Sequence, residues 1–295
     1  MAERSNEQIV IGSAIAVALG AFVAWAGSDG GDRAGTVPVF ALCGALAFAI
    51  NWLAFVPAML LQTERYYDLT GGITYITTTI VAVLLSRELD LRAALVAAMV
   101  MFWSLRLASY LFRRISKSGK DSRFDDIKNR PPRFFLAWTL QGLWVLLTAA
   151  AALAVITGGT REPLGAVGVA GIIIWLIGIL IEIVSDRQKS NFKDNPDNEG
   201  KFINVGLWAW SRHPNYFGEI ILWAGMAIVA VPVLHGWQWT TLISPVFVAF
   251  LLIKVSGIPI LEEKADERWG GNDDYEEYKR RTSVLIPKSP ALEEN

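Results

Sequence analysis

Long apolar stretches separated by short polar connections dominate the chain. Seven of them approach the roughly 20 residues that a helix needs to cross a bilayer core. They occupy residues 9–27, 37–61, 92–112, 134–157, 164–184, 216–234 and 241–260. An eighth stretch, 73–86, is shorter and rich in threonine. Because these stretches are apolar all round, they predict an all-α, multi-pass integral membrane protein with seven to eight transmembrane helices.

The first stretch has two interpretations, a signal peptide or a retained helix. Ala24-Trp25-Ala26 could serve as a cleavage site. However, Arg4 is flanked by Glu3 and Glu7, and the stretch is long for the apolar part of a signal peptide. We therefore expect a retained first helix.

Composition supports the membrane assignment and excludes several other classes. The chain is 53% hydrophobic and 19% charged, whereas soluble domains carry about 25% charged residues. A single cysteine, Cys43, and two histidines exclude a disulfide scaffold, a zinc finger and an iron–sulfur cluster, so we expect no metal site. The net charge of −1 argues against a nucleic-acid partner. No GxGxxG pattern occurs, so we expect no Rossmann domain.

Positive charge between the apolar stretches predicts their orientation. Eight Lys or Arg residues lie in 113–133, five in 185–215 and six in 261–295, against four in all the opposite connections together. The positive-inside rule therefore makes these three segments cytoplasmic. With eight spans the N-terminus is also cytoplasmic, and with seven it lies on the other side. We predict one membrane domain over 1–295, two basic cytoplasmic loops (113–133 and 185–215) and a cytoplasmic tail (261–295), with a surface helix at 274–287.

Four ionisable residues lie within or at the edge of apolar stretches: Arg106, Glu182, Glu219 and Lys254. Such residues cost at least about 2.5–3.5 kcal/mol in the centre of a membrane helix, so they usually face a partner or a cavity. Two interpretations stay open: pairing between helices, or a polar cavity that opens to the cytoplasm.

The segment after residue 184 carries the densest polar pattern of the chain. It includes SDRQKSNF at 185–192 and SRHPNYFGE at 211–219. Pro214 suits the first turn of a helix. Cations, amide side chains, Tyr216 and a helix N-terminus together suit a ligand with phosphates and an aromatic ring. The alternative is a belt of Lys and Arg that anchors lipid headgroups.

These motifs resemble the steroid 5-alpha-reductase family, particularly its bacterial relatives. The resemblance is carried by SRHPNYFGE, SDRQKSNF and the W-x-x-R-L pattern at 103–107. It implies an NADPH-dependent 3-oxo-5-alpha-steroid 4-dehydrogenase that acts on a steroid or a similar enone lipid. It also implies a monomer in the bacterial inner membrane, in contact with membrane lipid, with its cofactor on the cytoplasmic side.

A second family shares part of the pattern. Isoprenylcysteine carboxyl methyltransferases carry a similar RHP-x-Y-x-GE element and bind S-adenosylmethionine. By itself, the element therefore indicates a membrane enzyme with a cytoplasmic, adenosine-containing cosubstrate. A membrane methyltransferase is the alternative function, and a non-catalytic lipid-binding or transport protein is the third.

The resemblance to steroid reductases implies a catalytic group formed by Gln62, Glu64 and Tyr110. Hydride transfer to the β-carbon of an enone builds negative charge on the carbonyl oxygen, which a hydrogen-bond donor stabilises. A water-poor pocket could keep Glu64 protonated as that donor, with Tyr110 as the second donor and Gln62 orienting Glu64. Tyr66, Tyr67 and Asp68 are alternatives, and QTERYYD at 62–68 could instead be a solvated turn.

The same resemblance implies the remaining site residues. The abundance of cations favours NADPH over NADH, because the 2′-phosphate requires Arg or Lys. The cations expected at the phosphates are Arg113, Arg114, Lys120, Arg123, Lys193 and Arg212. Further residues expected at the cofactor are Asp186, His213, Asn215, Tyr216 and Glu219, with Tyr275 and Tyr278 as a cover. Trp52, Phe55 and Trp103 are expected to wall an apolar substrate pocket.

Overall fold

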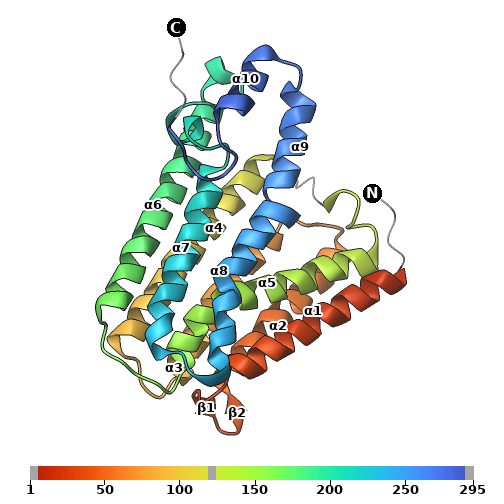
Figure 1. Cartoon of the computed structure of the whole chain (residues 1–295). Coiled ribbons are helices and arrows are strands. Elements are labelled where there is room, and N and C mark those ends of the chain that lie inside the picture. The colour runs from red at the N-terminus through yellow and green to blue at the C-terminus, as the bar shows by residue number, and fades with distance from the viewer. Residues whose placement is uncertain (1–5, 119–123, 290–295) are drawn as a thin grey trace. The chain divides into compact units, whose positions relative to one another are not determined.

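Helices form nearly all of the regular structure (Figure 1). The computed structural model describes residues 6–118 and 124–289. The first seven α-helices are α1 (Asn6–Gly27), α2 (Val39–Leu60), α3 (Tyr67–Leu85), α4 (Leu91–Ser118), α5 (Pro131–Thr157), α6 (Ala166–Asp194) and α7 (Pro214–Ala230). They are followed by α8 (Ile243–Phe250), α9 (Ile258–Trp269) and α10 (Asp273–Arg281).

Short elements connect these helices. Strands β1 (Arg33–Ala34) and β2 (Val37–Pro38) pair antiparallel as a small hairpin. The 3₁₀ turns are η2 (Pro196–Asn198), η3 (Gly206–Ala209), η4 (Val231–Val233) and η5 (Gly236–Leu242), and η6 (Leu251–Val255) is a π-helical segment.

Eight segments of the described chain are long and apolar enough to cross a membrane. The threonine-rich stretch 73–86 is one of them, because it forms most of α3. Leu53, Leu60 and Leu84 are 72%, 77% and 74% exposed, as expected of side chains that face lipid. The prediction of an all-α, multi-pass membrane protein is confirmed, with the higher of the two predicted numbers of spans.

Threonine is compatible with α3 because its hydroxyls bond within the helix. Thr70, Thr74 and Thr78 donate to the carbonyl oxygens four residues earlier, at 2.7–2.8 Å. Hydroxyl groups without such partners would be costly in an apolar environment. The hydroxyls that make this stretch more polar than the other predicted spans therefore find their hydrogen-bond acceptors within α3.

The chain divides into two compact units, which are described separately. Unit 1 comprises Met1–Gly168 and Val229–Ser244, and unit 2 comprises Val169–Ile228 and Pro245–Asn295. In unit 1, α5 contacts each of α1–α4 and is buried over almost its whole length. Figure 1 shows α1 and α2 running beside it. The run of small residues Ala149–Ala152 lets the neighbouring helices approach α5 closely.

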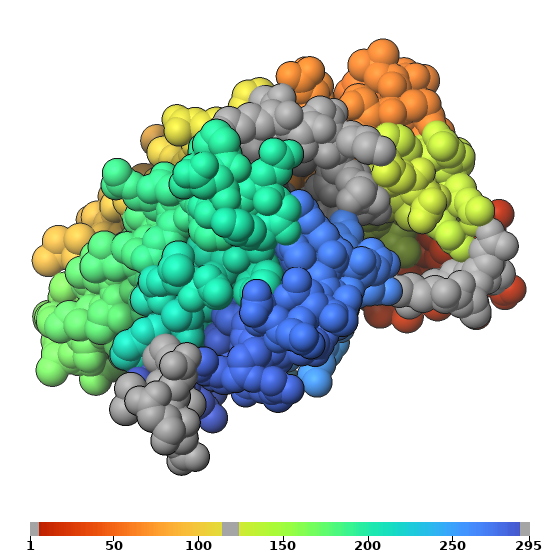
Figure 2. Space-filling view, turned by 90° about the horizontal axis from the view of Figure 1, so that it is seen from above, coloured from red at the N-terminus to blue at the C-terminus, as the bar shows by residue number. Residues whose placement is uncertain are grey.

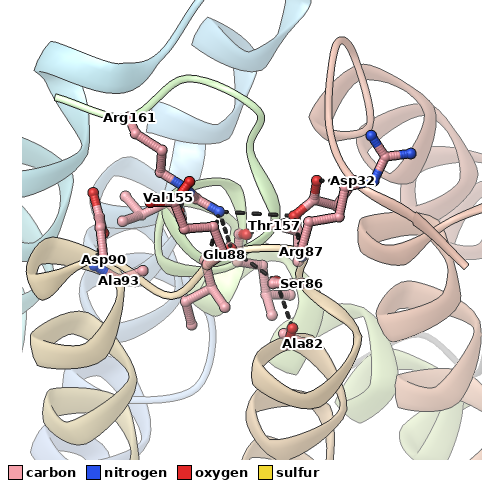
Figure 3. A network of polar contacts seen from close by, with 12 residues as sticks. Asp32, Ala82, Ser86, Arg87, Glu88, Asp90, Ala93, Val155, Thr157 and Arg161 are labelled. Carbon is pink, nitrogen blue, oxygen red and sulfur yellow. Dashed lines mark hydrogen bonds and ion pairs between the residues drawn. The ribbon is translucent and has the colours of Figure 1, made fainter.

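A network of charged residues ties one end of unit 1 together (Figure 3). The Arg161 guanidinium donates to Val155 O, Ile156 O and Glu88 O, so it satisfies carbonyls at the C-terminus of α5. It also lies 3.7 Å from the carboxylate of Asp32, which is 8% exposed. Asp32 in turn accepts the backbone N–H of Arg87, just after α3. The network therefore joins the α1–α2 connection to the ends of α3 and α5.

In unit 2, α6 and α7 pack with their backbones in close approach. A Cβ atom on Gly218 of α7 would lie 2.7 Å from Gly178 O and 2.8 Å from Glu182 N, both on α6. One on Gly225 would lie 2.5 Å from Trp175 N. Only glycine fits at such distances, as is typical of small-residue packing between membrane helices. Pro214 begins α7, as its position predicted.

The last apolar stretch is interrupted rather than continuous. Helix α8 passes into the π-helical segment η6, and α9 begins only after Gly257. A Cβ atom at Gly257 would lie 2.4 Å from Leu252 O, so glycine permits this sharp break. The sequence predicted one helix over 241–260, and the break was not anticipated.

The tail of unit 2 lies along the loop that precedes α7. The predicted surface helix at 274–287 is shorter than expected, because α10 ends at Arg281. The residues that follow run beside 210–212. Arg212 N donates to Ser283 O at 2.9 Å, and Lys288 N donates to Trp210 O at 3.0 Å. Figure 2 shows the blue tail against the teal surface of this loop.

Candidate functional site

Gln62 and Glu64 lie in the turn that follows α2. Gln62 has a positive φ of 49°, in the left-handed region. Its exposed side chain donates to Met59 O at 2.7 Å, so the amide bonds back to the end of α2. The sequence predicted that this amide would orient Glu64. The structure places the amide against the end of α2, and its role toward Glu64 stays a prediction.

Glu64 is buried and forms an ion pair. Its side chain is 5% exposed, and its Oε2 accepts a hydrogen bond from Lys128 Nζ at 3.1 Å. This hydrogen bond raises the pKa of Lys128. In this pair Lys128 donates and Glu64 accepts, and the predicted role of Glu64 as a donor to a substrate stays a prediction. Sequence reasoning missed Lys128, because nothing distinguishes it from the other cations of 113–133.

The tyrosines near Glu64 differ in their surroundings. Tyr67 donates to Ala137 O at 2.9 Å and packs among Phe124 and Trp138, which is a structural role. Tyr66 is 51% exposed. Tyr110 is half-buried on α4.

A small cavity lies between α3, α4 and α5 in unit 1. Its volume is about 20 Å³, enough for a group the size of a water molecule. Trp103 lines it, together with Asp68, Tyr75 and Ser104. The sequence considered Asp68 only as an alternative, and it missed Tyr75. The signal for both was their spacing of seven residues, which places them on one face of α3.

Trp52 and Phe55 were predicted to share a wall with Trp103. They lie elsewhere in unit 1, against α5: Trp52 Nε1 donates to Thr139 Oγ1 at 3.0 Å, and the ring of Phe55 packs edge-on against Phe134. Neither residue lines the cavity described above. Their contacts give both residues a packing role against α5, and their part in a substrate pocket stays a prediction.

In unit 2, the close approach of α6 and α7 gathers four polar residues. Glu182 and Asp186 lie on α6, and Asn215 and Glu219 on α7. Asn215 Nδ2 donates to Asp186 Oδ1 at 3.4 Å. The two glutamates and Asp186 are each less than 9% exposed. Three of the residues predicted at the cofactor, Asp186, Asn215 and Glu219, therefore share the interface of two packed helices.

Arg212 and His213 converge on one carboxylate of α9. Arg212 Nη1 lies 2.6 Å from Glu262 Oε2, and His213 Nε2 lies 2.7 Å from Glu262 Oε1. The ring of His213 stacks on that of Tyr216 at 5.6 Å and 10°. Burial lowers the pKa of His213. Glu262 was missed, although the doublet Glu262-Glu263 directly after an apolar stretch was a signal.

The other cations predicted to bind phosphate are either exposed or outside the part of the chain whose side chains the structure describes. Arg113 and Lys193 are exposed. The structure does not describe the side chain of Arg114, and Lys120 and Arg123 lie outside the described residues. Lys189 lies over the ring of Trp208 at 4.4 Å.

The tail tyrosines hold the loop before α7. Tyr278 donates to Trp208 O at 2.8 Å, and Tyr275 donates to Asp266 Oδ1 at 3.2 Å. Both rings pack against Phe202. These contacts give the two tyrosines a structural role. Their role as a cover over the cofactor stays a prediction.

Residues 54–282 match the family described as "Protein of unknown function (DUF1295)". The chain belongs to this family. The DUF1295 description assigns no activity, so the relatives of known name carry more information. The chain is 28% identical over 117 residues to 3-oxo-5-alpha-steroid 4-dehydrogenase 1 of Rattus norvegicus, and the match covers 40% of each chain. It is 28% identical over 121 residues to steroid 5-alpha-reductase DET2 of Arabidopsis thaliana, again over 40% of each.

A methyltransferase also matches this DUF1295 chain. The probable O-methyltransferase ustE of Ustilaginoidea virens is 35% identical over 99 residues, which cover 33% of the chain and 34% of the relative. The matched stretches thus span well under half the length of the curated relatives. No solved structure matches the chain. The comparisons support an integral membrane protein similar to steroid reductases.

Proposed function

We propose that this DUF1295 protein reduces the Δ4 double bond of 3-oxo-Δ4 steroids, or of a similar enone lipid, with NADPH. The observation that carries the proposal is the cluster at the start of α7. There, Asp186, Asn215 and Glu219 lie beside the Arg212–His213–Glu262 contacts, in a chain similar to named steroid 5-alpha-reductases.

The residues of this cluster fit a dinucleotide. His213 is 4% exposed, and its Nδ1 has no hydrogen-bond partner among residues 6–118 and 124–289. A buried nitrogen without a partner is costly unless a ligand or water meets it. The N-terminus of α7, a helix of 17 residues, favours phosphate oxygens. Arg212, Asn215 and Tyr216 would hold the cofactor there, with Lys193 as a further cation.

The predicted catalytic group, with Lys128 added to it, would polarise the substrate carbonyl. When bound, NADPH supplies the hydride. The ammonium of Lys128, held by Glu64, and the hydroxyl of Tyr110 would donate hydrogen bonds to the carbonyl oxygen and stabilise its developing charge. Gln62 would orient Glu64 indirectly, because its backbone conformation and its bond to Met59 O shape the turn that carries Glu64.

We further propose a monomer in the bacterial inner membrane, with the basic loops and the cofactor on the cytoplasmic side. The excess of Lys and Arg in 113–133 and 185–215 supports this orientation.

A membrane methyltransferase that uses S-adenosylmethionine is the second candidate. The similarity to the probable O-methyltransferase ustE favours it. The same cluster in unit 2 would then hold the adenosine part of that cosubstrate. The ion pair of the buried Glu64 with Lys128 would have no evident role in methyl transfer.

The test is reduction of testosterone by the purified protein in lipid nanodiscs. The loss of absorbance at about 340 nm measures the consumption of NADPH. Mass spectrometry identifies the saturated ketone. We expect Glu64→Ala to slow turnover by about 10²–10³-fold while NADPH binding is retained, because the cluster in unit 2 is untouched.

Asp125→Asn is the matched control for Glu64→Ala. Asp125 also lies close to Lys128, at 3.6 Å, but it is far more exposed than Glu64. We expect this variant to keep nearly the parent rate. Methylation of a lipid acceptor by the parent protein, without any consumption of NADPH, would replace the reductase proposal by the methyltransferase.

A further inference from the structure

One carboxylate, that of Glu262, holds both basic residues of the SRHPNYFGE motif. Its two oxygens are divided between them, Oε1 at 2.7 Å from His213 Nε2 and Oε2 at 2.6 Å from Arg212 Nη1. The Glu262 side chain is 24% exposed, the Arg212 side chain 13% and the His213 side chain 5%. All three groups are therefore largely withdrawn from solvent, where such hydrogen bonds are stronger than at a surface.

The contact with Glu262 determines which nitrogen of His213 carries the proton. Burial and the positive charges of Lys189 and Arg212 disfavour the charged ring, although the hydrogen bond that the ring donates to Glu262 opposes them. A neutral ring that donates from Nε2 to Glu262 keeps a lone pair on Nδ1. Nδ1 is then an acceptor that could receive an N–H or O–H group of a ligand.

The backbone of the motif is held by other contacts. Arg212 N donates to Ser283 O, and Ser211 Oγ donates to Leu285 O at 2.8 Å. The tail thus fixes where residues 211–213 lie, while Glu262 fixes how the two side chains are oriented. A binding residue whose rotamer is set by a neighbour is held ready for its ligand.

We propose that Glu262 is a positioning residue for the cosubstrate site: it fixes the orientation of Arg212 and the tautomer of His213. The inference rests on the proposed function only in that the site takes an adenosine-containing cosubstrate. It assigns Arg212 as a guanidinium shared between Glu262 and the ligand. It assigns His213 Nδ1 as the acceptor for a hydrogen-bond-donating part of the ligand, such as a hydroxyl or an amide.

The experiment measures dissociation constants of NADPH and of S-adenosylmethionine by calorimetry, for the full chain in nanodiscs. We expect Glu262→Gln to weaken binding of the parent's cosubstrate by about tenfold to a hundredfold, the range of a charge-assisted hydrogen bond. Glu263→Gln is the matched control, because Glu263 is the exposed neighbour on α9. We expect its binding to be unchanged.

A double-mutant cycle separates positioning from a general structural role. If Glu262 acts through Arg212 and His213, then the loss caused by Glu262→Gln is smaller in the Arg212→Gln background than in the parent, because only the contact with His213 is still left to lose. Additive losses, or unchanged binding in Glu262→Gln, would overturn the inference. A thermal unfolding scan identifies any variant that fails to fold. If Glu262→Gln fails, Glu262→Asp, which keeps the charge but shortens the side chain, replaces it in the cycle.

The two parent measurements distinguish this inference from the proposed function. Binding of S-adenosylmethionine and not of NADPH overturns the reductase proposal, while the cycle still tests Glu262. If the parent binds neither compound, both proposals are wrong.

Discussion

At the scale of single residues, the partner of a charged group decides its chemistry. Sequence reasoning assigned Glu64 as a protonated donor and Arg212 as a cation for phosphate. The structure pairs Glu64 with Lys128 and Arg212 with Glu262. Each pairing adds a contact that the sequence did not predict: Lys128 Nζ donates to Glu64, and Glu262 partly compensates the charge of Arg212.

Gln62 provides a test at this scale. Its positive φ costs a non-glycine residue about 1–2 kcal/mol. We therefore expect Gln62→Gly to keep the turn, to raise the melting temperature slightly and to retain reductase activity. Gln62→Val places a β-branched residue at the same φ, so we expect lower stability and lower activity. Melting curves and turnover of both variants check this.

A direct role of the Gln62 amide predicts a different result. In that case the glycine variant would lose activity as severely as the valine variant, although it folds at least as well as the parent.

At the scale of elements, backbone approach between helices assembles the cluster of unit 2. Gly178 and Gly218 bring α6 and α7 so close that Asp186 and Asn215 meet. The break after η6 has a similar effect, because it sets the direction of α9 and hence the place of Glu262. Glycine at a few positions thus controls where charged side chains meet.

Gly218→Ala tests this packing. The added Cβ would meet backbone atoms of α6 at 2.7–2.8 Å, which cannot move aside as a flexible side chain could. We expect a destabilisation of about 1–3 kcal/mol, the usual range for overpacking, with weaker cosubstrate binding. Thermal unfolding and calorimetry measure the two effects.

Gly12→Ala is the control for this substitution. It also replaces a glycine within a helix, but its Cβ would meet only Leu136 side-chain atoms at 3.9 Å. We expect it to be neutral or slightly stabilising, since alanine favours helix more than glycine does. Equal losses in the two variants would contradict a special role for the α6–α7 contact.

At the scale of the whole molecule, eight spans and the distribution of charge together predict the topology. With eight spans, the positive-inside rule predicts that the start of α1 and the segment after the last span lie on the same side as the basic loops. The hairpin of β1 and β2 and the network around Asp32 and Arg161 then belong to the opposite side (Figure 3).

Cysteine labelling in intact cells tests this topology. The native Cys43 is buried, so it provides a silent background. We expect an impermeant maleimide to label Thr36→Cys, in the exposed hairpin, and to leave Glu199→Cys unlabelled until the cells are lysed. Labelling of Glu199→Cys before lysis would reverse the orientation and move the cosubstrate site to the other side of the membrane.

The sequence by itself determined the class of protein, because the length and apolarity of a span are local properties that a bilayer imposes. It also located the SRHPNYFGE motif, the start of α7 at Pro214 and the residues Asp186, Asn215 and Glu219. It did not single out Lys128, Tyr75 or Glu262, since the contacts of each are with residues distant in the chain. Tertiary structure alone decided those contacts, because ion pairs and close helix packing depend on which residues the fold brings together.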